Sequence, residues 1–153
     1  MLFTGHAEVI IDAKGRLAIP AKYRGQLKAE VDGTAWYCVP WKKGQLRLYT
    51  EKKFEVLAEQ GQQGLTPGED MAEMEATFFG FAERLEPDST GRIVVPKNLL
   101  EMAGLGSEVV VVGARNRLEV RDKATWDTQK DERFTKMPAL VERIEARNAG
   151  KTV

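Results

Sequence analysis

The sequence predicts a mainly β fold with short helices, of the α+β class, in which two tandem repeats share one pseudo-two-fold core. Residues 12–20 (DAKGRLAIP) recur as residues 88–96 (DSTGRIVVP), 76 positions later. Leu17 and Ile19 alternate with polar or small residues, as in a half-buried strand. The chain has 153 residues, so each half alone would bury too little apolar surface to be stable. A shared, pseudo-symmetric core is therefore expected.

The elements of the first repeat follow from its turn and breaker residues. Asp12 can bond its own backbone two residues on, and Gly15 supplies a positive φ, so residues 12–15 form a tight turn. Pro20 ends the strand that follows and starts a short helix. In order, we expect strands at 8–11 and 16–19, a short helix at 21–24, strands at 36–40 and 45–49, and a helix over about 51–60.

The second repeat follows the same plan. We expect strands at 81–85, 92–95, 109–112 and 118–120, a short helix at 96–103, and a helix from 123 to about 134. The offset between the copies falls to 72 at the closing strands, so the first copy carries four extra residues, which we place near Asp32. A helix over about 69–77 lies between the copies, and a separate final stretch begins at Pro138. The expected organisation is a first repeat at 6–53, a helical linker at 54–81, a second repeat at 82–125 and a C-terminal helical segment at 126–153.

Composition argues against an enzyme. The chain has one His, one Cys and two Ser residues, which leaves almost no material for a catalytic triad or a Cys/His metal site. Neither a dinucleotide-binding nor a P-loop glycine motif occurs. We therefore expect no catalytic residue, no cofactor, no metal and no small-molecule substrate. The single Cys38 fits a reducing compartment, and no membrane span is visible, so a cytoplasmic protein is expected.

The repeated Asp-x-x-x-Arg turn is the main functional lead. Asp and Arg flank a tight reversal, so their side chains can meet. One interpretation is an ion pair that only stabilises the turn, which at an exposed site contributes about 0–1 kcal/mol. The other is that Asp orients a guanidinium group whose free edge recognises phosphate or a base edge. The turn alone leaves both interpretations open.

Charge distribution favours recognition through the first copy. The net charge of the chain is zero, but charge is unevenly spread between the repeats. Residues 12–27 carry four basic side chains against Asp12 alone, whereas residues 88–103 are balanced. The four are Lys14, Arg16, Lys22 and Arg24. A local basic patch of this kind can bind nucleic acid, especially if phosphate contacts accumulate across the subunits of an oligomer.

The opening MLFTG, residues 11–24 and the second Asp88-x-x-Gly91-Arg92 together resemble the MraZ family of bacterial transcriptional regulators, over essentially the whole chain. The resemblance implies two tandem swapped-hairpin repeats of the AbrB/SpoVT type. It also implies a ring-shaped homo-oligomer that binds double-stranded DNA at short direct repeats. The expected target is the promoter of the division and cell-wall gene cluster, including the regulator's own gene, on the nucleoid.

The same resemblance assigns roles to the turn residues. Lys14 and Arg16 would read DNA, with Asp12 as the orienting residue, and Asp88 and Arg92 hold the matching places in the second copy. The expected DNA-binding residues are Lys14, Gly15, Arg16, Lys22, Arg24 and Arg92; the expected turn or orienting residues are Asp12, Asp88 and Gly91. Two alternatives remain: another AbrB-like regulator of the antitoxin type, and an oligomeric interaction module that does not bind DNA.

Overall fold

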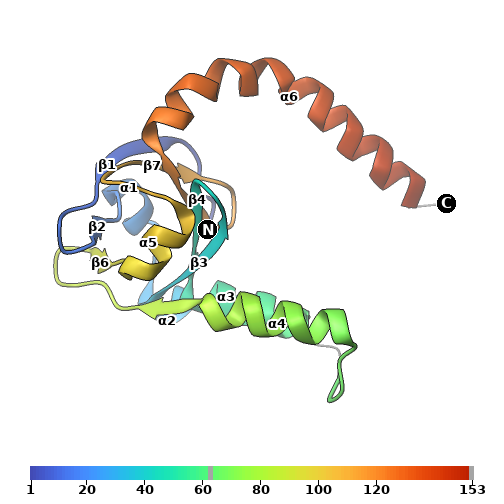
Figure 1. The fold of residues 1–153 in the computed structure, drawn as a ribbon, viewed down its shortest axis with the longest axis horizontal. Coiled ribbons are helices and arrows are strands. Elements are labelled where there is room, and N and C mark those ends of the chain that lie inside the picture. The colour runs from blue at the N-terminus through green and yellow to red at the C-terminus, as the bar shows by residue number, and fades with distance from the viewer. Residues whose placement is uncertain (62–63, 152–153) are drawn as a thin grey trace.

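The computed structural model describes residues 1–61 and 64–151. Its elements, in chain order, are β1 (His6–Ile10), β2 (Arg16–Ala18), α1 (Ala21–Arg24), α2 (Ala29–Asp32), β3 (Trp36–Lys42), β4 (Gln45–Thr50), α3 (Glu51–Gln60), α4 (Glu69–Phe81), β5 (Glu83–Leu85), β6 (Arg92–Val94), α5 (Lys97–Ala103), β7 (Glu108–Gly113), β8 (Leu118–Asp122) and α6 (Lys123–Lys151). This confirms the predicted α+β class (Figure 1). No helix within the described ranges has both the length and the apolar character to cross a membrane.

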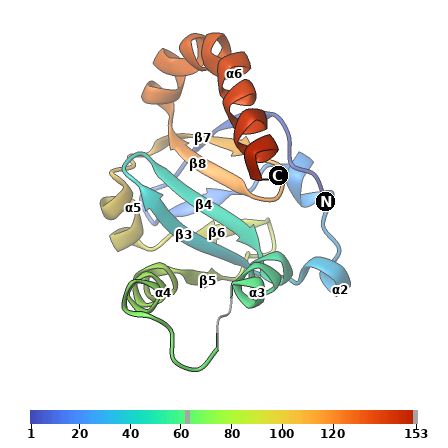
Figure 2. The same ribbon diagram turned by 90° about the vertical axis from the view of Figure 1, so that its right-hand side faces the viewer.

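The two repeats interleave their strands in one antiparallel sheet. The strand order is β1-β7-β8-β4-β3-β5, so strands of the second copy lie beside strands of the first (Figure 2). The remaining two strands, β2 and β6, form a separate ribbon, again with one strand from each copy. The expected swapped-hairpin arrangement is therefore confirmed.

The pseudo-two-fold axis can be located from the strand register. In the ribbon, Leu17 lies opposite Ile93, its own equivalent in the second copy. In the sheet, Arg47 of β4 lies opposite Glu119 of β8, again its own equivalent. An antiparallel pair is symmetric about the point where a residue faces its counterpart, so the axis runs from the ribbon through the core to the centre of the sheet.

A single main core contains side chains of both copies. It joins fully buried residues of the ribbon, such as Leu17 and Ile93, to those of the central strands, such as Leu48 and Leu118. A smaller cluster lies around Phe54 of α3, on which Tyr37 and Phe78 stack. Neither copy could close the main core without the other, as the size of the halves predicted.

Most predicted boundaries lie within one or two residues of the observed ones, and the exceptions have physical reasons. The four extra residues of the first copy form α2, which ends at Asp32. Helix α4 continues to Phe81, which shortens β5 to Glu83–Leu85. Part of the predicted glycine- and glutamine-rich break between the copies, residues 62–63, lies outside the described residues.

The expected interruption at Pro138 is wrong, because α6 continues through it to Lys151. Proline removes one backbone hydrogen bond and bends a helix without necessarily ending it. The apolar residues Phe134, Met137, Val141 and Ile144 keep helical spacing across the proline. Figure 1 shows the consequence: α6 bends into an arch that leaves the rest of the molecule.

The shared core yields a first prediction. Residues 1–65 and 75–153, expressed separately, should each lack a cooperative thermal transition, because each half leaves its partner's side of the core exposed. Mixing the halves should restore the circular dichroism of the intact chain. Two independently folding halves would contradict the shared core.

Candidate nucleic-acid interface

The carboxylate of Asp12 builds the first turn. Its Oδ1 accepts hydrogen bonds from the backbone N–H groups of Lys14 and Arg16, both at 2.9 Å. Its Oδ2 accepts from Nε of Arg16. A backbone bond from Gly15 N to Asp12 O, 2.9 Å long, closes the reversal. One side chain therefore both shapes the turn and orients the guanidinium group.

The second turn repeats this geometry at Asp88. Its Oδ1 accepts from the backbone N–H groups of Thr90 and Arg92, at 2.9 and 3.0 Å, and its Oδ2 accepts from Nε of Arg92 at 2.8 Å. The copies differ at the third residue of the turn, which is Lys14 in the first and Thr90 in the second. The Thr90 hydroxyl donates to Asp88 at 2.8 Å, whereas Nζ of Lys14 has no partner in the part of the chain that the structure describes. Lys14 is thus the side chain that distinguishes the first turn.

Both turns require glycine at the position before the arginine. Gly15 and Gly91 have φ values of +80° and +81°, a conformation that other residues adopt at a cost. A Cβ on Gly15 would also lie 2.8 Å from the backbone oxygen of Val95 in the other copy. Gly15 therefore acts through its backbone, since it lets the two copies approach closely.

The turns lie at the two ends of the β2–β6 ribbon. Val95 N donates to Gly15 O at 2.8 Å, and Ile19 N donates to Gly91 O at 3.2 Å, so each turn is attached to the other copy. In Figure 1 the loops that enter β2 and β6 both lie at the left-hand edge. The ribbon therefore holds Arg16 and Arg92 on one rigid support.

Arg24 lies at the second turn, although it belongs to the first copy. A Cβ on Gly91 would lie 2.5 Å from Cδ and 2.8 Å from Nε of Arg24, so this side chain passes directly over Gly91. Nε of Arg24 donates to Ile19 O at 2.8 Å, which fixes its course. Interleaving thus gives each turn one carboxylate and two basic side chains: Asp12, Lys14 and Arg16 at the first, and Asp88, Arg92 and Arg24 at the second.

Lys22 is not brought to either turn. Its Nζ donates to His6 O at 3.0 Å, at the start of β1. Asp12 follows the other end of that strand, roughly 15 Å away at about 3.3 Å per residue. Of the residues predicted to bind DNA, Lys22 is the one that the fold separates from the rest.

The two turn arginines have donors to spare. Arg16 and Arg92 each use Nε to bind their aspartate, and their terminal nitrogens have no partner within residues 1–61 and 64–151. Their side chains are similarly exposed, at 34% and 39%. A planar group fixed along one edge, with N–H donors left on the other, suits bidentate contact with phosphate or with O6 and N7 of guanine.

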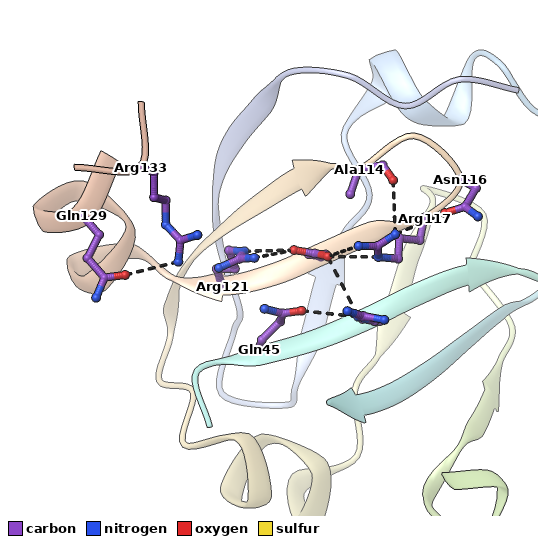
Figure 3. Close-up of polar contacts among 9 residues, drawn as sticks. Gln45, Ala114, Asn116, Arg117, Arg121, Gln129 and Arg133 are labelled. Carbon is purple, nitrogen blue, oxygen red and sulfur yellow. Dashed lines mark hydrogen bonds and ion pairs between the residues drawn. The ribbon is translucent and has the colours of Figure 1, made fainter. Parts of the chain in front are cut away.

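A second cluster of charge, centred on Glu119, was not predicted from the sequence. Figure 3 shows two of its arginines, Arg117 and Arg121. Arg117 and Arg121 stand two residues to either side of Glu119, and on a strand such residues share a face. Nη2 of Arg117 lies 2.8 Å from Oε2, and Nη2 of Arg121 lies 2.7 Å from Oε1. Burial raises the pKa of Glu119, but the hydrogen bonds and charges of these arginines outweigh it, and the net effect is a lowered pKa. The Arg-x-Glu-x-Arg pattern was the signal that could have found the cluster.

Two features of the described residues bear on catalysis and metal binding. The Cys38 thiol is buried, which raises its pKa to about 12 and keeps it protonated at neutral pH. Among the described residues, no group of three or more His, Cys, Asp or Glu side chains is arranged to hold a metal ion.

A duplicated swapped-hairpin fold with an arginine-bearing turn in each copy defines a pseudo-symmetric domain that presents two oriented guanidinium groups at its surface. The sequence profile of the family described as "MraZ protein, putative antitoxin-like" matches residues 2–72 and 78–144. The chain therefore belongs to the MraZ family.

Individual relatives align with this chain over most of their length. The transcriptional regulator MraZ of Shewanella denitrificans is 33% identical over 138 residues, which is 88% of each chain. That of Coxiella burnetii (strain RSA 493 / Nine Mile phase I) is 32% identical over 131 residues, 86% of each chain. That of Thioalkalivibrio sulfidiphilus is 32% identical over 133 residues, 87% of this chain and 88% of the relative.

The turn carboxylates predict a specific acid sensitivity. Backbone and side-chain hydrogen bonds from Arg16 lower the pKa of Asp12, and the backbone bond from Arg92 and the Thr90 hydroxyl lower that of Asp88, both below the ordinary 3.8. Between the lowered folded value and 3.8 the unfolded chain binds more protons, so stability rises with pH there. The contribution is complete above 3.8 and is lost as pH falls through the folded pKa values.

We therefore expect the double variant Asp12→Asn/Asp88→Asn to show a flatter dependence of stability on pH below about pH 4. The amide oxygen of Asn can still accept the backbone bonds of each turn, so the fold should persist. Urea midpoints measured from about pH 5 to pH 2 test this. Parallel curves for the variant and the parent would show that the two turns do not contribute to acid sensitivity.

Proposed function

We propose that this chain is a sequence-specific DNA-binding transcriptional regulator that reads short direct-repeat boxes through its Asp–Arg turns. The observation that supports this proposal most directly is that Arg16 and Arg92 are each fixed by a carboxylate along one edge and keep their terminal N–H donors available. A purely structural ion pair does not require such an exposed donor edge. The rigid β2–β6 ribbon supports presentation of the two arginines at a constant separation.

The first turn is proposed as the dominant reading element. Lys14 adds a second cation beside Arg16, and its exposed Nζ is available for a phosphate. Its counterpart Thr90 is neutral and directs its hydroxyl to Asp88. Arg24 offers a contact near the second turn, so the second turn is proposed as the supporting one.

The proposed target is the promoter of the division and cell-wall gene cluster, including the regulator's own gene. The membership of the chain in the MraZ family supports this choice. The proposed place of action is the cytoplasm, in association with the nucleoid.

A gel-shift titration of turn variants tests the proposal. Arg16→Ala should nearly abolish operator binding, because a lost bidentate contact to guanine costs about 1–3 kcal/mol in each engaged subunit and an oligomer multiplies the loss. Lys14→Ala should weaken binding to all sequences alike and reduce the salt slope by about 1. Arg92→Ala should lower stability more than affinity.

Two controls make the titration decisive. Lys52→Ala removes an exposed lysine of α3, outside both turns, and should leave affinity unchanged. Melting curves should show that Arg16→Ala remains folded. If Arg92→Ala loses binding while Arg16→Ala keeps it, the reading turn is the second one. If no variant changes a salt-dependent affinity, the turns do not read DNA and an interaction module becomes the better description.

We further propose that the regulator acts as a ring-shaped homo-oligomer assembled through α6. This helix carries five apolar side chains that are between 46% and 74% exposed: Phe134, Met137, Leu140, Val141 and Ile144. Five such residues on one stripe would face water in a single chain, which is costly unless a partner covers them.

The complementary surface is the groove between α3 and α4. A cavity of about 520 Å³ there is lined by apolar side chains that include Leu57, Met71, Met74 and Phe78. Helix α4 carries four acidic and no basic residues, whereas α6 carries seven basic and five acidic ones. Because α6 and the groove are different surfaces of one chain, their contact is head-to-tail and can close into a ring.

Light scattering at micromolar concentration tests the assembly. Leu140→Asp/Val141→Asp should reduce the mass to that of one chain, because it places two charges in the apolar stripe. The matched control Ala139→Asp/Ala146→Asp adds the same charges to the opposite face of α6 and should keep the oligomer. A parent chain with the mass of a single copy would rule the ring out.

A further inference from the structure

The face of the sheet around Glu119 carries more positive charge than its carboxylate can neutralise. Glu119 is 5% exposed, and both of its oxygens are occupied by Arg117 and Arg121. Nε of a third arginine, Arg47, lies 4.0 Å from Oε2, and its guanidinium group lies 3.9 Å from the ring centre of Trp41. Three cations therefore surround one anion, in a chain whose net charge is zero.

A polar cavity adjoins this cluster at the tip of the β3–β4 hairpin and the start of α6. Its volume is about 260 Å³, and four of its lining side chains are basic: Lys42, Lys43, Arg121 and Arg133. The lining includes one acidic residue, Asp122. Its Oδ2 already accepts the backbone and hydroxyl bonds of Thr125, so it is engaged in starting α6.

The basic groups are held in place around the cavity. The guanidinium groups of Arg121 and Arg133 each lie 5.8 Å from the ring centre of Trp126. Figure 3 shows these two guanidinium groups on the same side of the cluster, one reaching from β8 and the other from α6. Nη2 of Arg133 donates to Gln129 at 3.2 Å. Cations that line one cavity repel one another, and an anion between them would relieve that repulsion.

The cavity also contains neutral and unpaired donors. Gln45 is 2% exposed, and its Oε1 accepts from Nε of Arg47 at 3.4 Å. Its amide N–H groups have no partner in the described parts of the chain. The same holds for the Nζ atoms of Lys42 and Lys43. The cavity therefore presents N–H donors in excess of acceptors.

The first copy fills the equivalent place with apolar side chains. Trp126 is the counterpart of Phe54, at the offset of 72. Phe54 is buried by Tyr37 of β3 and by Phe78 and Phe79 of α4. None of the described helices covers Trp126 as α4 covers Phe54, and the ring of His6 and two arginines lie against it instead. Divergence of the repeats has thus replaced an apolar contact with a basic cavity.

We propose that this cavity is a binding site for a phosphoryl anion. Arg121 and Arg133 offer guanidinium donors suited to phosphate oxygens, and Lys42 and Lys43 add mobile point charges at the rim. The volume accommodates a phosphate or pyrophosphate group. The phosphoryl group belongs either to a small molecule or to a DNA backbone, and the site is separate from the Asp–Arg turns.

Thermal melting of the full-length protein with pyrophosphate tests the site. At ten times the dissociation constant, binding of pyrophosphate should raise the melting temperature of the parent by about 3–6 °C. Sodium chloride at the same ionic strength should not reproduce the rise. Lys42→Gln/Lys43→Gln should remove most of the rise, because it takes away two of the four basic side chains that line the cavity. The fold should persist, since both lysines are exposed and neither Nζ has a partner among the described residues.

The matched control is Lys52→Gln/Lys53→Gln, which removes an adjacent pair of lysines from α3, the first exposed and the second half-buried. This variant should respond to pyrophosphate as the parent does. An equal response of both double variants, or a response to pyrophosphate no larger than to sodium chloride, would overturn the proposal. The gel-shift titration of turn variants tests the turns and the pyrophosphate melting tests the cavity, so failure of one proposal leaves the other intact.

The source of the phosphoryl group follows from the salt dependence of DNA binding. If the cavity holds DNA backbone, Lys42→Gln/Lys43→Gln should reduce the salt slope by about 1–2, and pyrophosphate should compete with DNA. If the ligand is a small molecule, the slope should match that of the parent and calorimetry should show about one pyrophosphate bound per chain. If calorimetry detects no binding of pyrophosphate to a parent protein that melts normally, both the DNA version and the small-molecule version of the proposal are overturned.

Discussion

The antiparallel pairing of each repeat with its own counterpart determines the rest of this structure. Leu17 faces Ile93 in the ribbon, and Arg47 faces Glu119 in the sheet. These two pairings fix the axis that relates the copies. They also force the strands to interleave, because β2 and β6 pair with each other and leave the sheet that contains β1 and β5. A core shared by both copies is then unavoidable.

Interleaving also redistributes charge between the candidate DNA-reading turns. In sequence, Arg24 belongs to the basic first copy, and the second turn looks neutral. In space, α1 of the first copy lies against the second turn, and Arg24 passes over Gly91. Counting charge along the chain therefore exaggerates the difference between the turns. What remains different is local: an available Lys14 in one turn and an engaged Thr90 in the other.

The parts of the fold that sequence predicted are those set by local chemistry. Asp, Gly and Pro at fixed positions determine the turns and the short helices, and the repeat itself predicts the shared core. The long α6 was missed because a proline rule based on local geometry ignores the apolar stripe on both sides of Pro138. The Asp12–Arg16 contact was predictable from spacing. The position of Arg24, the separation of Lys22 and the cavity beside Trp126 depend on which elements become neighbours, and no short-range pattern contains that information.

The two repeats carry different residues at the pseudo-two-fold axis, and this difference affects which repeats can pair. In a symmetric dimer of identical repeats, the residue at position 47 would face a copy of itself, so two arginines or two glutamates would meet in a largely buried place. Such a like-charge pair is strongly unfavourable. In the duplicated chain the pair is Arg47 with Glu119, which is possible because the repeats are no longer identical. The same pair disfavours association of two first copies with each other, which would place Arg47 against Arg47. The axis contact thus favours the pairing of unlike repeats over the alternative pairings that swapped hairpins allow.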